Sequence, residues 1–166
     1  MKSVASLFAY KTWANAELFE LLDKAAVRML PETLRAAIRT LNHIHVVDTI
    51  FRAHLAGERH AFGATNTPES PTFEALHAAV TETDAWFERH AGAATPAELQ
   101  QTLAFKFTDG DAGRMSREEM LLHVVTHGGY HRGGVGQVLQ SAGFGAPRDL
   151  YTRFLHAAEP SRRSAE

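Results

Sequence analysis

The chain has 166 residues, 45% of them hydrophobic, which is enough for one domain with a continuous core. Its formal net charge of −2 argues against a nucleic-acid partner or a charged membrane surface, and no segment approaches the roughly 18 apolar residues of a membrane span. The absence of cysteine excludes disulfides, thiolate zinc sites and thiol catalysis, and it fits a cytoplasmic protein.

Two long amphipathic helices are expected in the first third of the chain. From about Ser3 to Ala25, apolar residues recur at steps of three and four, which is typical of one buried stripe. The second helix is expected from Pro31, a residue that suits a first helical position, to about Ala56. Gly57 is placed to end it.

A third helix and a short hairpin are expected in the middle of the chain. Ser70 can cap the helix with Pro71 at its first position, and the helix can extend to about His90. Residues 103–107 alternate as a short strand does, and a tight-turn sequence follows at residues 109–110. A small hairpin or an irregular segment therefore precedes the last long helix.

The last long helix has the clearest start, because Ser116 and Glu119 form a capping-box pattern. It can extend to about Ser141, where Gly143 stops it.

The remaining residues add little to this all-α bundle. A short fifth helix is expected within residues 147–155. We find no internal repeat and no linker, so we predict one domain over residues 1–158 and a polar tail over residues 159–166.

Three of the ten histidines follow one another at steps of four in the last helix, at His123, His127 and His131. Each step rotates the side chain by only about 40°, so the three project near one face. His127 and His131 lie inside the apolar stripe and His123 lies at its edge. Such a pair can chelate one metal ion, but histidines bonded to backbone or water have the same spacing, and the pattern leaves both interpretations open.

A metal site needs a further ligand from another helix. His43 lies on the side of the second helix that we expect to face the core, whereas His45 is rotated by about 200° and should point outward. His54 has nearly the same angle as His43 but lies about 16 Å further along the axis. One ion cannot use both, and the pattern does not choose between them.

Three segments resemble the damage-inducible, DinB-like family of metalloproteins. They are residues 8–15 (FAYKTWAN), residues 41–43 (LNH) followed by Asp48, and residues 123–133 (HVVTHGGYHRG). Their order and spacing extend over residues 3–155. The resemblance implies an up-down-down-up four-helix bundle, often a homodimer.

The resemblance also implies one divalent metal ion per chain on three histidines. The matching positions are His43, His127 and His131, which favours them over His54 and His123. Imidazole suits zinc and nickel alike. Relatives of this family include bacillithiol and mycothiol S-transferases, which join low-molecular-weight thiols to electrophiles.

Two functions follow from this resemblance. The first is a metal-dependent enzyme for thiol S-transfer or hydrolysis, with small thiol and electrophile substrates and with His123 as the nearest candidate for a catalytic base. The second is a non-catalytic, metal-stabilised dimeric module for binding or stress response. One departure from the family pattern is that Gly134 follows Gly133, and Gln137 comes three residues later.

Other interpretations of these residues are weaker. A di-iron bundle would need two Glu-x-x-His motifs, and only Glu74 with His77 forms one. The glycines of residues 128–136 favour close helix packing or a dimer seam over a phosphate loop. Asp48 and Arg132 could either support the site or form solvated ion pairs.

Overall fold

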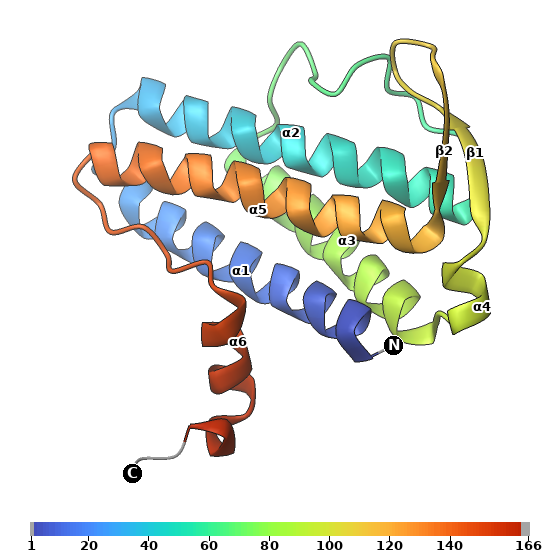
Figure 1. Cartoon of the computed structure of the whole chain (residues 1–166). Helices are drawn as coiled ribbons and strands as arrows, with labels where there is room; N and C mark the ends of the chain where they lie inside the picture. The colour runs from blue at the N-terminus through green and yellow to red at the C-terminus, as the bar shows by residue number, and fades with distance from the viewer. Residues whose placement is uncertain (1, 164–166) are drawn as a thin grey trace.

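In the computed structural model, which describes residues 2–163, four long helices form the bundle (Figure 1). They are α1 (Lys2–Ala26), α2 (Pro31–Ala56), α3 (Phe73–Ala93) and α5 (Arg117–Ser141). They run up, down, down and up, as expected, and α1 and α2 each pack against both α3 and α5 (Figure 1). None of the helices in this described part of the chain is long and apolar enough to cross a membrane.

Most of the helix ends lie where the capping residues predict them. Gly57 ends α2 with a φ of 72°, and the Ser116–Glu119 capping box starts α5. The predicted start of α3 at Ser70 and Pro71 was wrong, because Thr72 is the N-cap and its hydroxyl accepts from the amide of Ala75. Both residue types can cap a helix, and this later start places Phe73 in ring contact with Phe19.

The predicted hairpin is present, and its strands β1 (Thr102–Lys106) and β2 (Ala112–Ser116) are antiparallel. Gly110 adopts a φ of 99° in its turn. On β1, Phe105 is buried against Phe51 of α2, so the hairpin covers one end of the bundle. The one-turn helix α4 (Pro96–Leu99) precedes the hairpin and was not predicted.

The last helix, α6 (Tyr151–Ala158), begins later than the sequence predicted and projects from the bundle (Figure 1). The segment before it, residues 144–150, has no regular secondary structure, and within it Asp149 forms an ion pair with Arg132 of α5. Within the predicted polar tail, residues 160–162 form a short 3-10 helix (η1), and residues 164–166 lie outside the described part.

The core of the bundle is divided into two hydrophobic clusters. The first surrounds the stacked rings of Phe8 and Phe87, next to the hairpin. The second surrounds Leu18 and Leu139, next to the turn between α1 and α2. On each of the four long helices, at least one buried polar residue stands in the sequence between the residues of the two clusters. They are Lys11, Asn15, Asp48, Asp84 and Arg132, and we call them the polar layer.

Lys11 is the centre of the polar layer and is fully buried. Its Nζ lies 2.7 Å from Oδ2 of Asp48 on α2 and 2.6 Å from Oδ1 of Asp84 on α3. Burial alone would lower the pKa of Lys11, but the two carboxylates outweigh it and raise the pKa. The ammonium therefore stays charged and joins α1 to α2 and α3.

Replacing this ammonium should destabilise the fold. Lys11→Met leaves the Asp48 and Asp84 carboxylates buried without their cation, so we expect the free energy of unfolding to fall by roughly 3–5 kcal/mol. Urea unfolding followed by circular dichroism measures this. Lys24→Met, which removes an exposed partner of Glu20, is the control and should leave the midpoint unchanged. Equal midpoints for both variants would contradict a structural role for the buried ion pairs.

Candidate metal centre

The structure brings together three histidines from two antiparallel helices. His43 lies in the middle of α2, and His127 and His131 lie one turn apart on α5. One nitrogen from each ring lies within 4.8 Å of the others. The Nε2 atoms of His43 and His127 are 3.1 Å apart, and the His131 ring centroid is 4.6 Å and 4.5 Å from those of His43 and His127.

The hydrogen bonds of His43 fix its neutral tautomer. Its Nδ1 lies 2.8 Å from the carbonyl oxygen of Thr65, which can only accept, so Nδ1 carries the proton. In the neutral ring, Nε2 is then unprotonated, and its lone pair faces Nε2 of His127. A second-sphere carbonyl that orients a ligand ring in this way is common at metal sites.

The facing Nε2 atoms of His43 and His127 can share either a proton or a cation. Nδ1 of His127 is buried without a partner, so hydrogen bonds leave this ring unsatisfied in either tautomer. With the His127 proton on Nδ1, both Nε2 lone pairs face one point, and a cation there would satisfy them. The three residues therefore fit a divalent metal ion.

The separation of these nitrogens also suits an ion. Two imidazole ligands at usual zinc–nitrogen distances in a tetrahedral site stand about 3.3 Å apart. The observed 3.1 Å between His43 and His127 is close to this value. His131 completes the group from the next turn of α5.

The electrostatics of the site keep the imidazoles of His127 and His131 neutral. Burial, followed by the neighbouring His131, His43 and His123 and by Lys11, lowers the pKa of His127 to about 3. Burial and then His43 also lower the pKa of His131. Metal binding needs unprotonated nitrogen, so these rings do not have to lose a proton at neutral pH before an ion binds.

The segment between α2 and α3 holds the Thr65 carbonyl in place. Asn42, the buried neighbour of His43, donates to Oγ1 of Thr67 over 2.7 Å. The Thr67 hydroxyl in turn donates to the carbonyl of Glu69 over 2.6 Å. This clamp ties residues 65–69 to α2 beside His43.

The other sequence candidates lie outside the three-histidine group. His123 is one turn before His127, and its ring centroid is 4.6 Å from that of Phe51 and 5.4 Å from that of His127. His54 contacts His60 and Phe105 near the hairpin. Burial lowers the pKa of both His123 and His54, and the neighbouring His60 lowers the pKa of His54 further.

Arg132 and Asp48 are both buried in ion pairs rather than solvated. Arg132 donates from Nε to Oδ2 of Asp149 over 2.7 Å and from Nη1 to Oδ1 of Asn15 over 3.3 Å. Tyr10 also donates its hydroxyl proton to the Asp149 carboxylate, and burial, with Asp149, raises the Tyr10 pKa to about 12. These contacts hold the segment before α6 against α1 and α5.

Sequence reasoning missed Lys11 and Asp84. The signal was available for Lys11, because it stands seven residues from both Val4 and Leu18 on the inner stripe of α1. Asp84 stands four residues after Val80 and three before Phe87, on the inner stripe of α3. A charged residue on an apolar stripe indicates a buried ion pair.

One glycine of the 128–136 run has a direct role beside the polar layer. A Cβ at Gly128 would lie 3.1 Å from Nη1 of Arg132 and 3.5 Å from Cε of Lys11. The predicted close packing is therefore found at Gly128, whereas a Cβ at Gly133 or Gly134 would meet nothing within 4 Å.

Comparison with known proteins identifies the family of this chain. The model of the DinB family matches residues 1–163. The chain belongs to the DinB family. Protein DinB of Bacillus subtilis (strain 168) is 24% identical to it, in a match that covers 90% of this chain and 91% of that relative. The whole described bundle thus corresponds to the family.

Metal content is the direct test of the three-histidine group. We expect untagged wild-type protein to carry about one zinc or nickel ion per chain by mass spectrometry. His43→Ala and His127→Ala should each lose it, because two imidazoles remain where three are needed. His123→Ala is the matched control and should retain the ion. A wild-type protein without metal, whose unfolding does not change on adding zinc or nickel, would contradict the site.

The Thr67 clamp should tune metal affinity. Thr67→Val keeps the shape of the side chain but removes the hydroxyl between Asn42 and the Glu69 carbonyl. We expect metal affinity to fall about tenfold, because the Thr65 carbonyl no longer holds His43 in its tautomer. Competition with a chromogenic chelator measures this. Thr81→Val removes a comparable hydroxyl bond on α3 and should leave the affinity unchanged.

Proposed function

We propose that this protein is a metal-dependent enzyme that transfers a low-molecular-weight thiol to an electrophile. The observation that carries the proposal is the number of ligands. Within residues 2–163, the group that could hold an ion contains three histidines and no fourth side-chain ligand. Three protein ligands and one open position are the usual arrangement of a catalytic zinc site, whereas structural sites are closed by four.

The reaction needs a nucleophile from outside the chain. The sequence has no cysteine, so a thiol has to come from a substrate. When bound, a divalent ion lowers the pKa of a thiol or a water, so that the nucleophile is available near neutral pH. A sulfur–carbon bond then forms while the leaving group departs with its electron pair, and the thiol proton is released.

The residue that we propose to receive that proton is His123. Its ring lies beside His127 at the edge of the group, and burial lowers its pKa, so it is neutral and can accept a proton. Its contact with Phe51 holds the ring in position without using it as a ligand. We propose it as the general base.

The placement of the site favours catalysis over a purely structural ion. Two hydrophobic clusters and the polar layer already join all four long helices. The bundle therefore has a core that does not depend on the ion, unlike small domains that unfold without metal. Zinc and nickel both suit the ligands. We propose a homodimer on the family resemblance alone, and a cytoplasmic location because the sequence has no cysteine.

The activity test combines the metal-loaded protein with bacillithiol, mycothiol or another low-molecular-weight thiol and a chromogenic aryl halide. We expect thiol-dependent turnover in the wild type. Turnover should fall to background in His43→Ala, and it should fall about 10²-fold in His123→Ala because the base is lost. His77→Ala, on the exposed face of α3, is the control. Hydrolysis of an activated ester without thiol would instead support the hydrolytic alternative. A metal-loaded protein without an exchangeable ligand position and without turnover would contradict both.

A further inference from the structure

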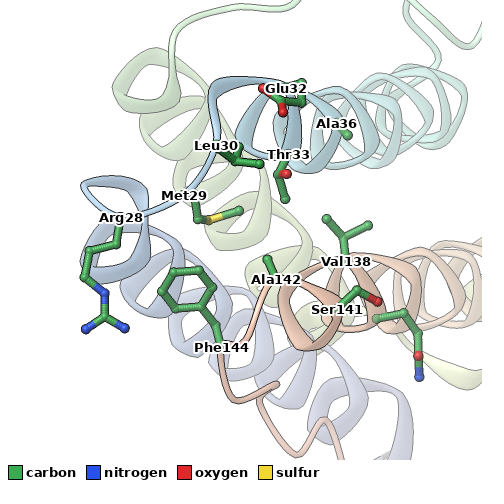
Figure 2. Close-up of a pocket in the computed structure, with 11 residues that line it drawn as sticks. Arg28, Met29, Leu30, Glu32, Thr33, Ala36, Val138, Ser141, Ala142 and Phe144 are labelled. Carbon is green, nitrogen blue, oxygen red and sulfur yellow. The ribbon is translucent and has the colours of Figure 1, made fainter.

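A cavity of about 600 Å³ lies between the ends of α2 and α5, beside the turn that joins α1 to α2 (Figure 2). Its walls are largely apolar. They include Met29, Leu30, Ala36, Val138, Ala142 and Phe144.

This cavity lies on the same helix faces as the three histidines. Ala36 precedes His43 by seven residues on α2, and Val138 follows His131 by seven on α5. Seven residues complete almost two whole turns, so each pair shares a face at an axial separation of about 10 Å. Because α2 and α5 are antiparallel, both separations lead from the histidines in the same direction.

Residues at the intermediate turns of α2 and α5 flank the route from the histidines to the cavity. Gly134, one turn after His131, is exposed, and a Cβ there would meet nothing within 4 Å. On α2, Thr40 lies one turn from Ala36 and directs its hydroxyl to the Ala36 carbonyl over 3.1 Å. Arg39, one turn before His43, is exposed, so a ligand that bridges the two sites passes beside its side chain.

The polarity of the cavity limits what can fill it. The guanidinium of Arg28 lies 5.3 Å from the Phe144 ring centroid and points away from the cavity (Figure 2). Glu32 stands at one wall with its carboxylate, Gln137 adds an amide, and Thr33 and Ser141 add hydroxyls, whereas Met29, Val138 and Phe144 supply the larger, apolar part of the surface. This lining suits an uncharged alkyl or aryl group.

A second cavity does not share these features. It has about 210 Å³ and is lined by Arg132, Gly136 and Asp149, on the face of α5 opposite the histidines. The ion pair of Arg132 with Asp149 already satisfies its charged groups.

We propose that the 600 Å³ cavity binds the apolar body of the electrophilic substrate, whose reactive carbon lies about 10 Å away at the three histidines. This rests on the proposed function and narrows it to elongated electrophiles with an alkyl or aryl tail.

Alkyl hydroxamates of increasing chain length test this binding, because their head group ligates the metal and their tail reports on the cavity. With zinc-loaded protein, acetohydroxamate should bind weakly. Affinity should rise about threefold to fourfold per methylene once the tail reaches the cavity, and then level off. Fluorescence or calorimetric titration measures the dissociation constants and requires no turnover.

Ala36→Trp places a large side chain at the cavity wall on an exposed position of α2. It should leave acetohydroxamate affinity unchanged and lower decanohydroxamate affinity about 100-fold, to the short-chain level. Ala75→Trp, at an exposed alanine of α3, is the matched control and should keep the full dependence on chain length.

The outcomes distinguish failure of the cavity proposal from failure of the proposed thiol-transfer function. Binding of acetohydroxamate without any effect of chain length would overturn the cavity proposal and leave the open metal position intact. Failure of every hydroxamate to bind the zinc-loaded protein would overturn both. A change from dimer to monomer in Ala36→Trp, measured by light scattering, would assign this face to a second copy of the chain and would also overturn the proposal.

Discussion

The buried ammonium of Lys11 between the carboxylates of Asp48 and Asp84 is the constraint on which the rest of the bundle depends. Hydrophobic contacts tolerate sliding of one helix along another, but a buried charge without its partner costs several kcal/mol. The pair therefore sets the axial position of α1 against α2 and α3. Burial raises the pKa of Asp48 to about 6 despite the opposing effect of Lys11, which shows how far this layer is removed from solvent.

The same layer affects the metal centre. Gly128, next to His127 on α5, has no Cβ, and this leaves room for the side chains of Lys11 from α1 and Arg132 from the next turn of α5. A positive charge at this place disfavours protonation of His127, and it adds to the larger effects of burial and of the neighbouring histidines. The bundle thus holds its candidate ligands in the neutral form that a metal requires. An acidic residue in place of Lys11 would have the opposite influence on these rings.

The four long helices could be predicted because each has a periodic apolar stripe, and two of them, α2 and α5, have end signals that the structure confirms. The helix α4 could not, because four residues are too few to show a period. For the site, the spacing of His127 and His131 indicated one shared face. The choice between His43 and His54 depended on how far α2 is displaced along α5, which no local pattern encodes. Burial of Lys11 and Asp84 depended on the partner that each meets across the core.

The histidines stand at the edge of the core rather than at its centre. On α2 and α5 the fully buried residues Ala37 and Leu139 are turned by roughly 120° from His43 and His127, so the group lies along the seam between these two helices. The seam is covered near Thr65 by the clamped segment, and in the other direction it leads past the exposed Gly134 to the wall of the apolar cavity. A centre covered by protein on one side can keep its ligands fixed, and on our proposal the substrate approaches from the other side. The helix pair that brings the ligands together would then also form the approach to them.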